Sequence, residues 1–204
     1  MAEYKLHCFA QSGNAYKAAL ALELAGADWE PLWVDFFKGA HRGDDYTAKN
    51  IMAEVPTLEH GGRSLSQSGA ILEYLVEATG KFAPADRYEG LRWILWDNHK
   101  LTSFMATWRF MANFLPEEKR SADVIAFAKG RATAALDVLN RHLAGRDWIV
   151  GDALSIADLS CIGYFFYTDH YDYDWQQVPN VVAWRDRIAA LPGWKHPNDL
   201  MPGS

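Results

Sequence analysis

The chain has 204 residues and a formal net charge of −6, from 20 Lys and Arg against 26 Asp and Glu, and half of its residues are apolar. This length allows one large domain or two small ones with a substantial core. The acidic balance and the lack of a basic run argue against nucleic acid as a partner. The 9 Trp, 9 Tyr and 10 Phe residues exceed what such a core usually needs, so some are expected to line a pocket or an interface.

The two cysteines, Cys8 and Cys161, lie far apart in separate apolar segments. They form neither a disulfide framework nor a C-x-x-C pair of the kind used for zinc or dithiol chemistry, and we expect no metal site. The amino-terminal residues lack the pattern of a signal peptide, and no stretch approaches the ~18 apolar residues of a membrane span. The sequence therefore predicts a soluble, cytoplasmic protein with no membrane partner.

The first predicted elements are a strand, a helix and a second strand. Residues 4–9 alternate in polarity, which predicts a strand, and the Ala- and Leu-rich residues 14–25 predict a helix that Gly26 ends. Residues 29–34 predict a second strand, at a sheet edge because Pro31 cannot donate to a ladder. Elements in this order form a parallel crossover unit.

A hairpin and a helix complete the first predicted domain. Short strands at 57–59 and 63–65 flank a His-Gly-Gly turn, and residues 66–79 predict a helix. We place the first domain at 1–78. Residues 79–86 contain Gly, Pro and Asp and predict a linker.

All elements predicted beyond the linker, in 87–204, are helical. Helical spacing extends over 87–112 and 121–143, a further helix is expected to start at Ser155, and the last is 181–191. The predicted fold class is therefore α+β, with a mixed-sheet domain followed by an all-α domain.

The segment AQSGNAYKAA, residues 10–19, places Ser12 and Asn14 between the first strand and the first helix. Such side chains are common helix caps. The free N–H groups and the dipole of a helix N-terminus also favour a negatively charged group. At this point both interpretations, a cap and an anion site, are open.

Three further motifs follow: VPTL at 55–58, LSQSGAILEYL at 65–75 and WIVGDALSIADL at 148–159. In this order and spacing the chain resembles the cytosolic glutathione transferases over essentially its whole length. The resemblance implies a thioredoxin-like N-terminal domain with a mixed four-stranded sheet, and an all-helical C-terminal domain. It also implies glutathione as substrate or cofactor, and a homodimer.

The resemblance assigns glutathione-binding roles to two of these motifs. Pro56 resembles the family's cis proline, which would turn the Val55 backbone toward the cysteinyl part of glutathione; the alternative is an ordinary trans proline at a strand start. Gln67 and Ser68 would hold the γ-glutamyl end at a helix N-terminus. The structural alternative is that Ser66 or Ser68 merely caps that helix.

The third motif has a structural interpretation. Ser155 and Asp158 have the spacing of a capping box. Asp158 resembles the family's buried, folding-related aspartate rather than a catalytic acid.

Ser12 and Asn14 are the predicted catalytic residues. A thioredoxin would have its nucleophilic cysteine at this corner, so the reactive sulfur is expected to belong to glutathione, with Ser12 and Asn14 donating hydrogen bonds to its thiolate. The pattern Ser12-x-x-x-Tyr16-Lys17 resembles both the zeta and the nu types. Asn14 favours nu, and Gly13 and Asn14 depart from zeta.

The remaining assignments are less specific. The resemblance places a side chain for the glycyl carboxylate of glutathione in the loop with Lys38, His41 and Arg42, and we assign this role to His41. The alternative is that His41 is a solvated loop residue that binds no ligand. The electrophile pocket is predicted at Ser103, Phe104, Trp108 and Arg109, while Trp93 and Trp96 suit the core or a dimer contact equally well.

The predicted function is a detoxifying glutathione transferase that adds the glutathione thiolate to a small apolar electrophile, or reduces a disulfide or peroxide with it. One alternative is a non-catalytic module that binds glutathione or a protein. Another is a glutathione-dependent cis-trans isomerase of the maleylacetoacetate type.

Overall fold

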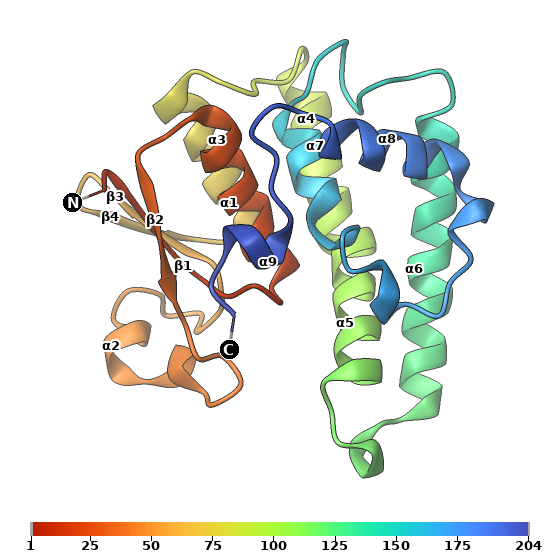
Figure 1. Ribbon diagram of the computed structural model, residues 1–204, viewed down its shortest axis with the longest axis horizontal. Coiled ribbons are helices and arrows are strands. Elements are labelled where there is room, and N and C mark those ends of the chain that lie inside the picture. Colours follow the sequence, from red (N-terminus) through yellow and green to blue (C-terminus); the bar gives the residue numbers. More distant parts are fainter. Residues whose placement is uncertain (1, 204) are drawn as a thin grey trace. The chain divides into compact units, whose positions relative to one another are not determined.

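The computed structural model describes residues 2–203, which divide into two compact units. The first extends to Ala83 and includes the segment from Leu191 onward, and the second is Pro84–Ala190. Within the described residues, the strands all belong to the first unit and the second is helical (Figure 1).

The first unit contains a mixed four-stranded sheet, as the resemblance implied, and β2 lies at an edge, as Pro31 predicted; the strand order is β2-β1-β3-β4. β1 (Tyr4–Cys8) is parallel to β2 (Trp29–Trp33) and antiparallel to β3 (Thr57–His60). β3 pairs with β4 (Arg63–Ser66) in antiparallel fashion. The helical segments are α1 (Gly13–Ala25), η1 (Ala40–Arg42), α2 (Asp44–Thr47), α3 (Ser68–Thr79) and α9 (Pro197–Leu200).

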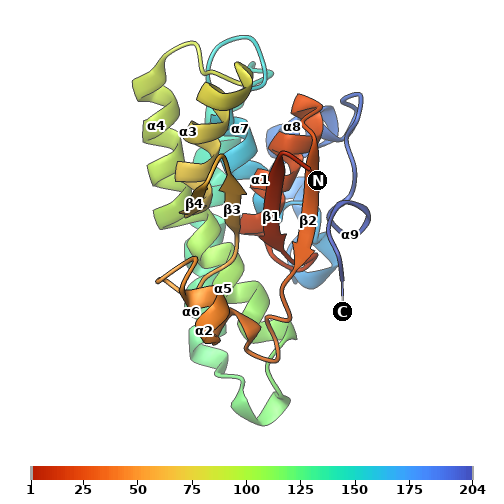
Figure 2. The ribbon, with the colours of Figure 1, turned by 90° about the vertical axis from the view of Figure 1, so that its left-hand side faces the viewer.

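Local chemistry explains how these elements begin and end. The β3–β4 turn contains Gly61 and Gly62 at φ values of 57° and 76°, the left-handed conformations that a type I′ hairpin requires. α1 ends at Gly26, which is also left-handed, as predicted. α1 and α3 lie together on one side of the sheet (Figure 2), where they cover the buried alternate residues of β1.

The C-terminal segment 191–203 belongs to the first unit, although the sequence-based boundaries placed it with the helical domain. The Tyr16 hydroxyl donates to the Lys195 carbonyl at 2.9 Å, and Lys195 Nζ lies 2.7 Å from Glu23 Oε1. The backbone N–H of Ala10 donates to Pro202 at 2.8 Å. These long-range contacts have no periodic signature in the sequence.

The second unit consists of helices and short helical turns: α4 (Arg87–Trp96), the π-helix η2 (Asp97–Leu101), α5 (Thr102–Asn113), η3 (Glu117–Lys119), α6 (Ala122–His142), α7 (Ile156–Cys161), η4 (Ile162–Tyr164), η5 (Thr168–His170), η6 (Trp175–Gln177) and α8 (Pro179–Ala189). The single helix expected at 87–112 is thus interrupted by η2. Among the described helices, none is both long and apolar enough to cross a membrane.

A buried carboxylate lies at this interruption. Asp97 is fully buried and accepts hydrogen bonds from Thr102 Oγ1 and Ser160 Oγ, each at 2.7 Å. Because Ser160 belongs to α7, the bond ties that helix to the α4–α5 junction.

A second buried carboxylate, Asp158, completes the capping box predicted at the start of α7. It is fully buried and accepts from the backbone N–H of Ser155 at 3.0 Å and of Ile149 at 2.9 Å. The Ser155 hydroxyl and Trp184 Nε1 also donate to it, at 3.1 and 2.9 Å. Burial raises the pKa of this carboxyl group, and its hydrogen bonds oppose that rise.

We expect Asp158→Ala to lower the free energy of unfolding by about 3 kcal/mol or more, because it leaves several buried donors without an acceptor. Urea denaturation of the full chain measures this loss. Asp152→Ala, at an exposed position of the preceding loop, is the control and should change stability by less than about 0.5 kcal/mol. An Asp158→Ala variant as stable as the parent would show that the network is not a stabilising one.

Candidate functional site

Ser12 caps α1 and keeps a donor for a ligand. Its backbone is extended (φ −89°, ψ 104°), and its Oγ accepts from the Ala15 N–H at 3.1 Å. The side chain is buried. A serine hydroxyl can accept and donate at the same time, and no acceptor for its hydrogen lies among the described residues. The cap and the anion-site interpretations are therefore compatible.

Asn14 joins two motifs that are far apart in sequence. Its Oδ1 accepts a long hydrogen bond, 3.4 Å, from the buried Ser68 hydroxyl at the start of α3. Since Oδ1 is occupied, the Nδ2 group keeps its hydrogens for another acceptor. The bond places the N-terminal turns of α1 and α3 next to each other.

The peptide bond between Val55 and Pro56 is cis, as the resemblance implied. The preceding carbonyl, that of Glu54, accepts from Tyr46 Oη and from Asn50 Nδ2, each at 2.7 Å. Within the described chain, the Val55 N–H and C=O have no hydrogen-bond partner. An extended ligand could pair with them as an added strand does.

The N-terminus of α3 is uncapped. Its N-cap residue is Gln67, at φ 69° and ψ 112°, and no described side chain caps the helix, so the alternative that Ser66 or Ser68 caps it is wrong. Gln67 Nε2 instead donates to Glu54 Oε2 at 2.7 Å and points to Met52 Sδ at 3.1 Å. The first N–H groups of α3 are therefore available to an anion.

His41 is a buried ring rather than the solvated loop histidine that was the alternative. It stacks on Phe36 at 4.1 Å between ring centroids, and Phe36 stacks on Phe9 at 4.9 Å. Burial, and secondarily the nearby Arg42, lower its pKa, so the ring is neutral at pH 7. Nδ1 has no partner among the described residues. Lys38 is exposed and pairs with Asp35 at 3.1 Å.

The four residues predicted for the electrophile pocket all lie on α5 but have different surroundings. Trp108 and Arg109 are buried within the helical unit, where Trp108 meets Tyr171 edge to face and Arg109 Nε donates to His170 Nδ1 at 2.8 Å. Ser103 is exposed and donates to the Asn98 carbonyl. Phe104 contacts Phe127 of α6.

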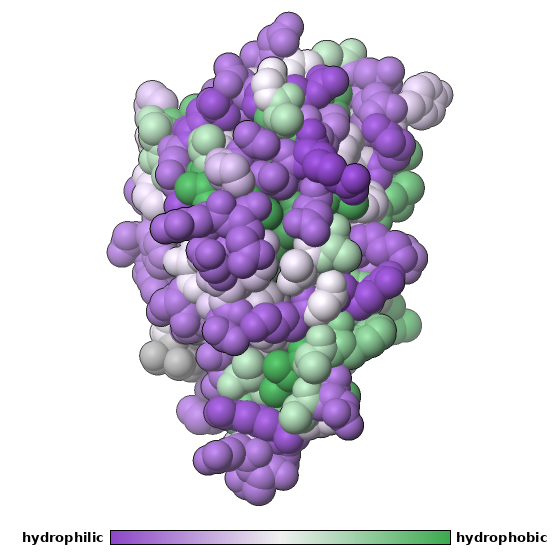
Figure 3. Space-filling view, turned by 90° about the vertical axis from the view of Figure 1, so that its right-hand side faces the viewer, coloured by the Kyte–Doolittle hydropathy of each residue, from purple (hydrophilic) through white to green (hydrophobic). Residues whose placement is uncertain are grey.

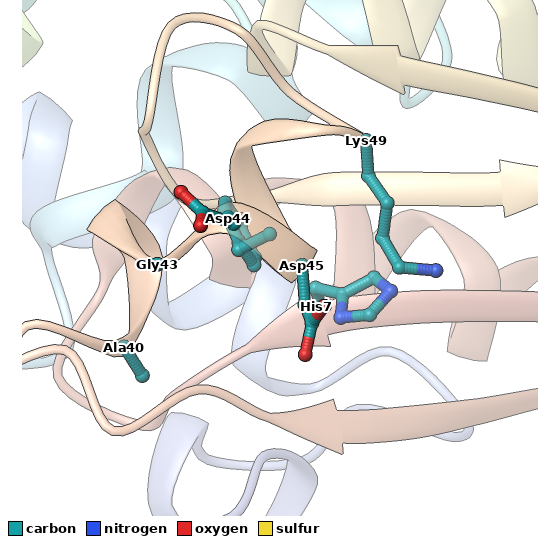
Figure 4. A pocket seen from close by; sticks show the side chains of 7 residues that line it. His7, Ala40, Gly43, Asp44, Asp45 and Lys49 are labelled. Carbon is teal, nitrogen blue, oxygen red and sulfur yellow. The ribbon is translucent and has the colours of Figure 1, made fainter.

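A separate pocket of about 500 Å³ lies between β1 and α2 (Figure 4). Lys49 extends toward His7 of β1, and Asp44 and Asp45 come from α2. His7 and Lys49 both bind the Glu59 carboxylate, and these two bonds lower its pKa. None of the predicted glutathione-binding residues lines this pocket.

The structure contains no group of His, Cys, Asp and Glu within residues 2–203 that could hold a metal ion. Cys8 and Cys161 are both buried. Burial raises the pKa of the Cys8 thiol to about 12, so it is protonated at neutral pH and is not a nucleophile.

Comparison with known proteins agrees with this arrangement. The glutathione S-transferase N-terminal domain matches residues 2–77, and the glutathione S-transferase C-terminal domain matches residues 101–192. A solved structure of a possible glutathione S-transferase from Rhodopseudomonas palustris is 34% identical, with a TM-score of 0.88, over 98% of this chain and 92% of that one. The chain belongs to the glutathione S-transferase family.

Individual relatives have different activities. Maleylacetoacetate isomerase of Rhizobium meliloti (strain 1021) is 29% identical over 98% of this chain and 99% of its own. The disulfide-bond oxidoreductase YfcG of Escherichia coli (strain K12) is 29% identical over 90% and 89%. A glutathione transferase from Burkholderia graminis, solved with two glutathione molecules bound per subunit, is 26% identical, with a TM-score of 0.83, over 94% and 85%.

We expect both cysteines of the native protein to be inert toward an aromatic disulfide reagent at pH 8, because Cys8 is a buried thiol with a raised pKa and Cys161 is also buried. Absorbance of the released chromophore should report almost no reaction over minutes. In denaturant, two thiols per chain should react at once. Rapid reaction of one thiol in the native state would contradict the assignment of the reactive sulfur to a bound molecule.

Proposed function

We propose that this protein is a glutathione transferase that stabilises the glutathione thiolate at the β1–α1 corner for attack on a small apolar electrophile, or on a disulfide or peroxide. The observation that supports it most is the hydrogen bond between Asn14 and Ser68. It brings the predicted thiolate donors and the predicted γ-glutamyl site together in one surface.

Glutathione would contact three parts of the first unit. Its cysteinyl amide would pair with the free N–H and C=O of Val55, as in β-augmentation. Its γ-glutamyl carboxylate would accept from the first N–H groups of α3. The loop with Lys38, His41 and Arg42 stays the predicted place for the glycyl carboxylate.

Two neutral donors suffice energetically to ionise the thiol. A free thiol has a pKa of about 8.5, and lowering it by about 2 units requires about 2.7 kcal/mol. Hydrogen bonds to a charged group contribute about 1.5–3 kcal/mol each, and a helix N-terminus adds about 0.3–1 kcal/mol. Ser12 and Asn14 at the start of α1 would supply this sum.

Either reaction of the thiolate is complete without a protein thiol. In conjugation, the sulfur forms a bond to carbon of the electrophile and either displaces a leaving group, which departs with its electron pair, or adds to an activated double bond, whose electron pair then takes a proton from solvent. In disulfide reduction, the thiolate displaces one thiolate and forms a mixed disulfide, and a second glutathione then releases the other thiol and oxidised glutathione. The isomerase and the oxidoreductase among the relatives have the same identity to this chain, 29%, and Asn14 favours the nu-like chemistry over the isomerase alternative.

The thiolate absorbs in the ultraviolet, so difference spectra of the glutathione complex across pH measure its pKa directly. We expect a value about 2 units below that of free glutathione. Ser12→Ala and Asn14→Ala should each raise the apparent pKa by about 1 unit or more, because each removes a donor to the charged sulfur. Ser12→Ala should also reduce stability by about 1 kcal/mol through the lost cap.

Gln67→Ala is the matched control, because it should weaken glutathione binding and leave the thiol pKa unchanged. If no thiolate band is present at pH 7.5 while glutathione is bound, the chain is a binding module instead of a catalyst. Assays with conjugation, disulfide-reductase and isomerase substrates then separate the remaining chemistries.

We also propose a homodimer, as the resemblance implies. Apolar side chains are exposed on the helical unit, including Leu95 of α4 and Phe127 of α6, each 62% exposed. Figure 3 shows apolar surface gathered toward one end of the face that it presents. Exposed apolar area of this kind is typical of subunit interfaces.

A combined Leu95→Arg and Phe127→Arg variant should halve the mass measured by light scattering, because two buried charges would oppose association. Gln176→Arg, which adds a charge at an exposed position outside these helices, should leave the dimer intact. A parent protein that is monomeric at micromolar concentration would refute the proposal.

A further inference from the structure

Three titratable side chains form a hydrogen-bonded relay at the end of the sheet opposite the β1–α1 corner. His60 ends β3 and Glu3 precedes β1, and the antiparallel pairing of these strands brings both to the same end of the sheet. Tyr74 extends toward them from α3. His60 Nδ1 lies 2.6 Å from the Tyr74 hydroxyl oxygen, and His60 Nε2 lies 3.1 Å from Glu3 Oε1.

The carboxylate of Glu3 sets the direction of both hydrogen bonds. An ionised carboxylate can only accept, so His60 Nε2 carries a hydrogen and donates it to Glu3. In the neutral ring, Nδ1 then has the lone pair and accepts from the Tyr74 hydroxyl. A hydroxyl, a base and a third group that orients the base is the arrangement of an activated nucleophile.

Packing and charge around the relay favour this role. The His60 ring stacks on Tyr4 with ring centroids 3.9 Å apart, and the His60 side chain is 18% exposed. Tyr74 is half-buried, and the Arg63 guanidinium lies 5.4 Å from the centroid of its ring. This positive charge stabilises the negative charge that develops on a phenol as it loses its proton.

We propose that Tyr74 is a nucleophile and a site of covalent acylation, with an activated acyl group such as a thioester as the donor. The Tyr74 oxygen forms a bond to the carbonyl carbon while its proton passes to His60 Nδ1. The sulfur leaves with the electron pair of its bond to carbon and takes up that proton from His60. The products are O-acyltyrosine and a free thiol, and His60 returns to its starting state.

Tyr88 of α4 offers an internal comparison for this reactivity. It is 82% exposed, and its hydroxyl has no hydrogen-bond partner among the described residues. We expect p-nitrophenyl acetate at pH 7.5 to acetylate Tyr74 at least about tenfold faster than Tyr88, because a positioned base accelerates such reactions by about 10²–10⁴-fold. Peptide mass spectrometry over a time course measures both rates in one sample of the full chain. If exposure alone decided reactivity, Tyr88 would react faster.

Three variants test the relay itself. Tyr74→Phe should abolish the fast acetylation and leave that of Tyr88 unchanged. His60→Gln should slow acetylation of Tyr74 by about tenfold or more, because it removes the base. Glu3→Gln should slow it by about threefold, since the Glu3 side chain is 59% exposed and only orients the ring. Glu3→Gln changes an exposed side chain and therefore tests the relay independently of the packing of His60.

Glu59→Gln is the matched control, because Glu59 is the neighbour of His60 in β3 but binds His7 and Lys49 instead. It should leave the rate at Tyr74 unchanged, and an effect equal to that of Glu3→Gln would overturn the role of Glu3. Acetylation of Tyr88 as fast as that of Tyr74 would overturn the proposal. An unchanged rate at Tyr74 in both His60→Gln and Glu3→Gln would overturn it as well.

Discussion

Backbone groups that no helix or strand pairs determine where this protein can hold a ligand. An N–H or C=O that has no partner in the protein must pair with water or with a ligand, so several such groups close together at the surface can bind a polar molecule. Here the uncapped start of α3 and the free amide groups of Val55 belong to one unit. The bond between Asn14 and Ser68 adds the α1 corner to them.

Most of this arrangement could be predicted from the sequence because its signals are local. Ser12, Gly26 and the Ser155-to-Asp158 spacing each act within one turn of helix, and each has its predicted structural role. Alternation and Pro31 likewise indicated the sheet and its edge strand. The catalytic roles of Ser12 and Asn14 remain predictions.

What the sequence did not indicate depends on tertiary contacts. Lys17 is fully buried, although a lysine in a helix is usually solvated. The amino-acid preferences of residues 97–101 do not predict a π-helix. It begins at Asp97, whose buried carboxylate accepts hydrogen bonds from Thr102 and Ser160. The hydrogen bond from Gln67 to Glu54 could not be predicted either, because the two residues are neighbours only in the fold.

A thioredoxin has a reactive cysteine at the corner between β1 and α1, where this chain has Ser12. A hydroxyl at this position is better suited to a reaction in which the thiol belongs to a bound ligand. A cysteine at position 12 would compete with glutathione for the donors of α1, and by exchange with oxidised glutathione it would form a mixed disulfide and release one glutathione. A serine satisfies the Ala15 N–H and still has a hydrogen that it could donate to the sulfur of a bound ligand. The only sulfur in β1, that of Cys8, is buried with a pKa of about 12 and does not compete. If glutathione binds here as we propose, the unpaired backbone groups of Val55 and of the start of α3 would hold the rest of it.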